Sequence, residues 1–132
     1  MNLRHVNPGQ IRFSPESAPD VVFVLHEPTF GEAQAAASAA GLRYSEEAQA
    51  AKAAGTAPPT SDQYVNYVHR ERFLRGVDGI ENLTLEGAPL ATAAEFVAAM
   101  PSLGAGALPL YNEVVNKLAE LATLSPGETK NS

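Results

Sequence analysis

Five apolar residues near the end of the chain recur at the spacing of one face of an α-helix. They stand at positions i, i+3, i+4, i+7 and i+10 and are Tyr111, Val114, Val115, Leu118 and Leu121. Because one helical turn holds 3.6 residues, a helix through these positions turns all five side chains to the same side. Pro109 suits the first turn of such a helix. An amphipathic helix must bury its apolar stripe, so the rest of the chain is expected to pack against this one.

The β-type residues lie in the first 28 positions. Residues 10–13 alternate between polar and apolar, which predicts a short half-buried strand. Residues 21–25, Val-Val-Phe-Val-Leu, are β-branched and aromatic and predict a more deeply buried strand. The link between them is rich in Pro and Ser, as turns are. We therefore predict a two-stranded β element. Because two strands alone are only marginally stable in water, this element must pack against the helices or against another chain.

Residues 29–59 are dominated by alanine, which strongly favours helix. Thr29 and Glu32 form a capping-box pattern, so one helix should begin there and end at Gly41. Ser45 predicts the start of a second helix, which Gly55 ends. Alanine buries little apolar area, so these helices are expected either to pack closely through small side chains or to be mobile until bound.

The remaining chain predicts two further helices before the final one. A helix should begin at residues 60–62 and stop at Gly76, followed by an ordered loop over residues 77–90 with one short extended piece. Thr92 and Glu95 form another capping-box pattern, for a short helix that Pro101 ends. The predicted fold is mainly α, with about five helices and a short two-stranded β element near the N-terminus. We expect one domain, made of an N-terminal extended segment (1–28), an Ala-rich helical segment (29–59), a helical core (60–127) and a flexible tail (128–132).

The sequence contains no recognisable arrangement of catalytic residues. The chain contains no cysteine, and His5, His26 and His69 lie far apart and share no ligand motif. No Gly-x-Ser-x-Gly turn is present, and the glycine pair at 104 and 106 lacks the lysine of a phosphate-binding loop. Asp78 and Glu81 are close in sequence, but no apolar pocket that would raise a carboxyl pKa can be inferred around them. We therefore predict no enzyme, no catalytic residue, no cofactor and no metal.

Charge and hydropathy narrow the class of partner. The formal net charge is −6, whereas a duplex nucleic acid requires a basic face. The only basic cluster, Arg70, Arg72 and Arg75, is interpreted as a solvated helix stripe. Stacking of single-stranded nucleic acid on the neighbouring tyrosines is the less favoured alternative. The longest apolar run is five residues, against the roughly 20 that span a bilayer, so no membrane partner is expected.

The order of short motifs from Tyr67 onward resembles a known family. Arg72-Phe73-Leu74-Arg75-Gly76 precedes Val77-Asp78-Gly79-Ile80, and the acidic-glycine turn Glu86-Gly87 precedes Pro89-Leu90. A short helix closing in Met100-Pro101, a longer helix through Tyr111 and a Lys130-Asn131-Ser132 ending follow. This order is similar to that of the tail assembly chaperones of long-tailed bacteriophages, small proteins encoded between the major tail protein and the tape measure protein. The resemblance covers about half to two thirds of the chain.

The resemblance implies a chaperone that binds the tape measure protein and keeps it soluble while the tail tube assembles. It places the chain in the cytoplasm of the infected bacterium, with the major tail protein as a second candidate partner and self-association left open. The alternative is a virion structural protein, a tail, neck or capsid accessory subunit, that binds neighbours through residues 1–28. A third, weaker interpretation is a host-directed protein that inhibits a bacterial enzyme. The predicted partner-binding or core surface is formed by Tyr64, Tyr67, Val68, Leu74, Tyr111, Val115 and Leu118.

Overall fold

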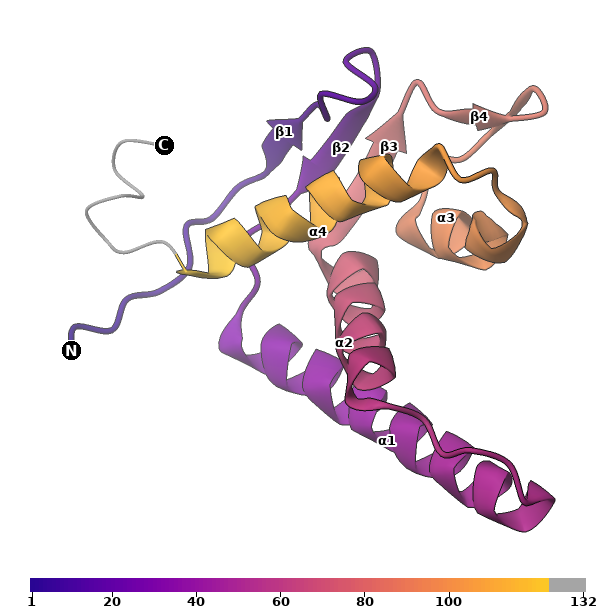
Figure 1. The fold of residues 1–132 in the computed structure, drawn as a ribbon. Coiled ribbons are helices and arrows are strands. Elements are labelled where there is room, and N and C mark those ends of the chain that lie inside the picture. The colour runs from indigo at the N-terminus through magenta and orange to yellow at the C-terminus, as the bar shows by residue number, and fades with distance from the viewer. Residues whose placement is uncertain (124–132) are drawn as a thin grey trace.

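The computed structural model describes residues 1–123, and the predicted flexible tail (128–132) lies outside the described residues. Its elements follow the order β1 (Ile11–Phe13), β2 (Val22–Leu25), α1 (Phe30–Ala54), α2 (Ser61–Gly76), β3 (Val77–Glu81), β4 (Thr84–Leu85), β5 (Ala88–Pro89), α3 (Ala93–Ala99), the 3-10 turn η1 (Met100–Ser102) and α4 (Ala107–Thr123). The sheet β1-β2-β3 is antiparallel, and β4 pairs with β5. Figure 1 shows α4 crossing the sheet, while α1 and α2 extend away from it.

The predicted fold class, mainly α with about five helices and two strands, is wrong. Within residues 1–123 the fold is α+β, with four α-helices and five strands in two small sheets. The two predicted helices of the Ala-rich segment are one continuous helix, α1, which passes through Gly41 and ends at Gly55. A glycine inside a helix costs only about 1 kcal/mol relative to alanine. The alanines around Gly41 and the contact of α1 with α2 outweigh that cost.

The third strand was missed because its side chains do not alternate. Val77 and Ile80 are both buried although they are three residues apart, which would place them on opposite faces of a regular strand. The register between β2 and β3 shifts at this point: Leu25 pairs with Val77 and Val24 with Gly79. Asp78 is therefore the extra residue of a β-bulge, which lets both apolar side chains face the core.

The second sheet was also expected to be part of a loop. Leu85 pairs with Ala88 across the two-residue turn of Glu86 (φ 52°) and Gly87 (φ 84°). Two successive residues with positive φ define a type I′ turn, whose twist matches that of paired strands. The predicted turn residues are therefore correct, and the strands that they join were overlooked because each has only two residues.

The core lies between the sheet and the helices α2, α3 and α4. Phe23 from β2, Phe73 from α2 and Phe96 from α3 are almost completely buried, and their ring centroids lie 5.3–6.2 Å apart. Tyr111 of α4 contacts the rings of Phe73 and Phe96, and burial raises the pKa of its hydroxyl to about 12 although Arg70 opposes the shift. The predicted stripe of α4 is confirmed: Val114, Val115, Leu118 and Leu121 are all buried.

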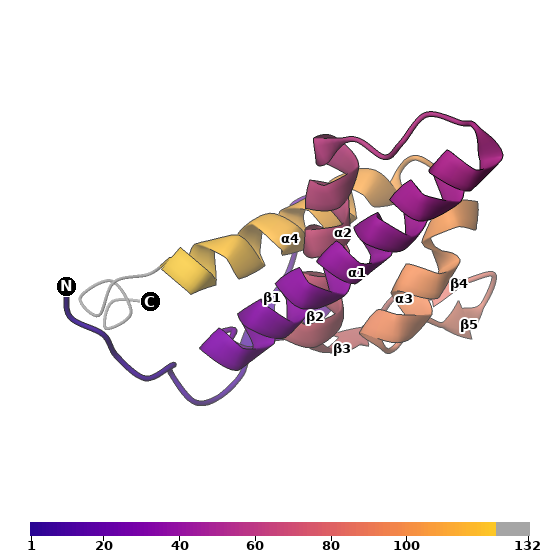
Figure 2. The ribbon, with the colours of Figure 1, turned by 90° about the horizontal axis from the view of Figure 1, so that it is seen from below.

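The helices α1 and α2 form an antiparallel hairpin (the α1–α2 hairpin), whose connecting loop lies at the end remote from the sheet (Figures 1 and 2). The side of α1 that faces α2 buries Ala36, Ala40 and Ala51, so the helices pack closely through small side chains. Tyr44 stacks edge-on against Tyr64 at 5.8 Å. Farther along, Tyr67 donates a hydrogen bond to Glu47 beneath the guanidinium of Arg43, which lies 4.7 Å from the tyrosine ring.

The capping boxes predicted at Thr29 and Thr92 are present, and Thr60, one of the three candidate N-caps at residues 60–62, forms a third; Ser45, predicted as a further helix start, lies inside α1. The hydroxyls of Thr29, Thr60 and Thr92 each accept a hydrogen bond from the backbone N–H three residues later, and the side chain at that later position accepts one from the backbone N–H of the threonine. These capping boxes satisfy backbone donors that have no partner within the helix. They fix the starts of α1, α2 and α3, whereas the glycine stop predicted within α1 failed. Among the described residues, no helix is both long and apolar enough to cross a membrane.

Candidate protein-binding groove

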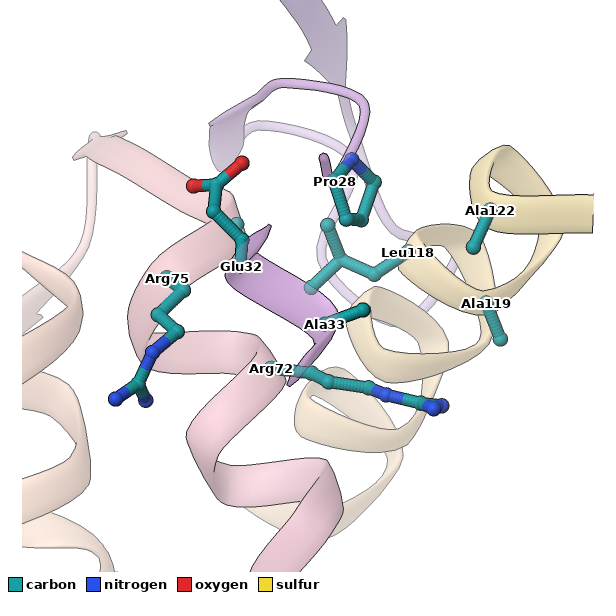
Figure 3. A pocket seen from close by; sticks show the side chains of 9 residues that line it. Pro28, Glu32, Ala33, Arg72, Arg75, Leu118, Ala119 and Ala122 are labelled. Carbon is teal, nitrogen blue, oxygen red and sulfur yellow. The ribbon is translucent and has the colours of Figure 1, made fainter. Parts of the chain in front are cut away.

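Three helices converge where α2 ends, and a pocket opens between them (Figure 3). The first turn of α1 forms one wall, the last turn of α2 a second and the last turns of α4 a third. We call this site the three-helix groove, and it is lined by Pro28, Glu32, Ala33, Arg72, Arg75, Gly76, Leu118, Ala119 and Ala122. Its cavity measures only about 40 Å³, and the wider empty space between its walls, open solvent included, is about 410 Å³.

Four of the nine residues that line the groove are glycine or alanine, and these small residues keep its walls low. Gly76 has no side chain, and an ideal Cβ built on it would lie 2.6 Å from Leu118 Cδ2. Leu118 forms the floor and is only 2 % exposed, so it belongs to the core as much as to the groove. Ala33 on α1 and Ala119 on α4 leave the walls low. Low apolar walls of this kind let a partner backbone approach closely.

The charged groups of the groove stand at its rim. Arg75 donates to the Glu71 carboxylate one turn earlier on α2, at 2.7 Å. Figure 3 shows Arg72 and Glu32 pointing in different directions. Within residues 1–123 the Arg72 guanidinium takes part in none of the ion pairs. The floor is thus apolar, and one cation is available at the edge.

The wall formed by α1 is fastened to the sheet through His26. Nδ1 of His26 lies 2.8 Å from Asp78 Oδ1 on the bulge of β3, and Nε2 lies 2.8 Å from Glu32 Oε2 on α1. The other oxygen of Glu32 accepts the capping hydrogen bond from the Thr29 N–H at 3.0 Å. One glutamate therefore caps the helix, binds the histidine and lines the groove.

This arrangement favours the charged form of both partners. Partial burial disfavours the imidazolium, but the hydrogen bonds and charges of Glu32 and Asp78 outweigh it and raise the pKa of His26 above its ordinary value of 6.5. Burial likewise disfavours ionised Glu32, but the Thr29 N–H and His26 together lower its pKa below the ordinary 4.5. A raised histidine pKa stabilises the fold fully below 6.5, and this contribution disappears as the pH rises through the folded-state pKa.

The structure places the seven predicted surface residues in three locations. Tyr64 and Tyr67 lie within the α1–α2 hairpin, together with the half-buried Val68. Leu74 and Tyr111 are half-buried against the core, and Val115 is buried in it. Leu118 is the only one of the seven that lines the groove. The seven residues therefore do not form one continuous surface.

The other groove residues were missed because sequence reasoning looks for large apolar side chains. Ala33, Ala119 and Ala122 read as helix-forming residues, and Gly76 read only as a helix stop. Only the fold brings these residues together, because Ala33 and the two alanines of α4 are more than 80 residues apart in the sequence. The available signal was the alanine pair at 119 and 122 beside Leu118, on the flank of the apolar stripe of α4.

The carboxylates considered as a catalytic pair have different partners. Asp78 contacts His26 and also accepts from the Gln10 amide at 3.1 Å. Glu81 forms a two-pronged pair with Arg12 on β1, at 2.8 and 2.6 Å, which lowers the pKa of its carboxyl. Both carboxylates thus act as ties between strands and neighbouring segments. Among residues 1–123, no group of three or more His, Asp or Glu side chains is placed to hold a metal ion.

The fold and groove together define a small α+β protein with a protruding helical hairpin and a small apolar pocket between three helices. Comparison with protein-family models, with curated proteins and with solved structures gave no match. The proposals that follow therefore depend on the residues and their geometry, and on the motif resemblance described above.

Proposed function

We propose that this chain is a non-catalytic tail assembly chaperone of a long-tailed phage, which binds helical segments of the tape measure protein in the cytoplasm of the infected cell. The observation that carries the proposal is the three-helix groove, an apolar site whose walls are low and whose rim is charged. A helix with an apolar stripe can place the end of one apolar side chain on the Leu118 floor and lay its neighbours along the rim. The alanine walls then allow the helix axes to approach to about 8–10 Å.

The size of the groove suits transient binding. A chaperone must release its client when the tail tube closes around the tape measure, so each contact should be modest. A cavity of about 40 Å³ takes no more than the end of one side chain, and three of its nine lining residues are alanines, which offer only a methyl group. Affinity would come from several such contacts along a repetitive client, each of which can be displaced separately.

One observation favours the virion structural protein as the second candidate. β1 is an edge strand of the three-stranded sheet, so its outer side offers backbone groups for strand addition by a neighbouring subunit. The segment before it is tied down, because Arg4 pairs with the buried Glu27 at 2.9 Å. Mass spectrometry of purified particles distinguishes the candidates, since abundant copies in the virion support the structural role and exclude the chaperone role.

Co-expression with the tape measure protein of the same genome tests the chaperone proposal. We expect the wild-type chain to keep the tape measure protein in the soluble fraction and to co-elute with it. The Ala119→Arg variant places a long charged side chain over the groove and should weaken this binding by at least about tenfold, or 1.4 kcal/mol. Affinity is measured by titration calorimetry with a soluble tape-measure segment.

The matched control is Ala35→Arg, the same change at an exposed position of α1 that does not line the groove. It should bind as the wild type does, and both variants should unfold at the wild-type urea midpoint. Equal binding by Ala119→Arg and the wild type would remove the groove from the proposal. Insoluble tape measure protein in the presence of the wild-type chain would remove the chaperone role itself.

A further inference from the structure

Both ring nitrogens of His26 face a carboxylate oxygen at 2.8 Å. A carboxylate can only accept, so each nitrogen must carry a hydrogen to make its contact favourable. Only the imidazolium carries both hydrogens. The neutral ring keeps one N–H and turns a lone pair toward the other carboxylate, which converts an attraction into a repulsion at the same distance. The observed geometry therefore belongs to the protonated state, on geometric grounds alone.

Glu32 is the carboxylate that the neutral ring would lose. Asp78 is short, sits on the β3 bulge and is also held by Gln10, so it remains beside the histidine. Glu32 has a longer side chain and belongs to α1, which touches the body of the protein mainly through its first turn and α2. Its capping bond to Thr29 lies within the same helix end, so it holds the helix together without fastening it to the sheet.

The surroundings of His26 add no competing charge. Glu32 faces it from α1 and Asp78 from β3, and from the end of α2 the backbone carbonyl of Gly76 accepts the His26 backbone N–H at 3.1 Å. Gln10, before β1, is uncharged and acts through Asp78. Among residues 1–123, Glu32 and Asp78 are the two charged side chains that form ion pairs with the ring.

We propose that His26 is a proton-operated latch of the three-helix groove, which holds the α1 wall in place while it is charged and releases it when it is neutral. Release frees the first turn of α1 from the sheet and widens the groove between α1 and α4. Client affinity would then change with pH in the range where histidines titrate. This inference adds regulation to the proposed binding site, but the latch can be tested without any client.

The absence of native cysteine makes a distance measurement straightforward. Spin labels are attached to the paired variants Gln34→Cys on α1 and Asn116→Cys on α4, both at exposed positions. Double electron–electron resonance is recorded from about pH 5.5 to about pH 8.5, a range that brackets histidine titration. We expect the distance distribution to shift and broaden toward longer values as the pH rises, with the midpoint that NMR gives for the His26 ring.

Two variants identify the cause. Glu32→Gln keeps the capping box, because glutamine also serves at that position, but removes the charge that His26 senses; its distances should not depend on pH. Asp78→Asn keeps Glu32, so its distances should still depend on pH, with a lower midpoint. An unchanged wild-type distribution over the whole range would overturn the latch, as would an unaltered pH response in Glu32→Gln. Neither result bears on whether the groove binds a client.

Discussion

Replacing Phe73 by alanine is expected to lower the free energy of unfolding by about 3–5 kcal/mol, the cost of truncating a buried aromatic residue in a packed core. Phe73 is 0 % exposed and contacts the rings of Phe23, Phe96 and Tyr111. It lies in α2 and joins the α1–α2 hairpin to the sheet, so its loss leaves a cavity at the point where hairpin and body meet. Urea denaturation followed by circular dichroism measures the change.

The control for Phe73→Ala is Val65→Ala, on the same helix but 45 % exposed. A substitution at such a site changes stability by about 0.5 kcal/mol or less. If Phe73→Ala were no more destabilising than this control, the aromatic cluster would not be the core of the fold. Total stabilities of small domains are about 5–15 kcal/mol, so a loss of this size removes a large share of the free energy of unfolding.

Gly76→Val should destabilise the protein by about 2–3 kcal/mol, at the upper part of the range for overpacked cores. The new Cβ would lie 2.6 Å from Leu118 Cδ2, 3.2 Å from Cδ1 and 3.4 Å from Cγ. The atoms that the new Cβ would meet are the branched end of the Leu118 side chain, which is 2 % exposed and belongs to the core, so it must shift against packed neighbours to make room. Thermal unfolding by calorimetry measures the effect.

Gly41→Ala is the control for Gly76→Val, and it should raise the free energy of unfolding instead of lowering it. Gly41 lies inside α1, its φ is not positive, and nothing lies within 4 Å of an ideal Cβ. Alanine should therefore stabilise the helix by about 0.5–1 kcal/mol. A destabilising Gly41→Ala, or a neutral Gly76→Val, would contradict the packing described for these two glycines. Comparing the two variants separates two effects of glycine: Gly41→Ala measures the conformational cost of glycine within a helix, and Gly76→Val measures the need for a residue without a side chain where two elements are in close contact.

Local signals in the sequence predicted local structure well. The threonine capping boxes fix three helix starts because they depend on residues only three positions apart. The stripe of α4 has the 3.6 period that any buried helix face requires. Gly41 misled the prediction because a glycine stops a helix only where nothing else sustains it, and here alanine propensity and the contact with α2 sustain it.

Features that depend on distant segments could not be predicted. β3 is recognisable as a strand only once β2 lies beside it, because the bulge at Asp78 removes the alternation that marks a strand. The groove depends on glycine and alanine residues, which carry no distinctive signal until three helix ends meet. His26 belongs to no motif that the sequence reveals, since its two carboxylate partners lie 6 and 52 residues away.

Amide hydrogen exchange of the chain with and without a soluble tape-measure segment tests the proposed binding mode most directly. Exchange reports the opening free energy of each segment, so a bound helix should slow exchange where it docks. We predict added protection at the first turn of α1, the last turn of α2 and the last turns of α4, the three walls of the groove. Protection confined to residues 1–13, where the N-terminal segment leads into β1, would contradict the groove and favour strand addition instead.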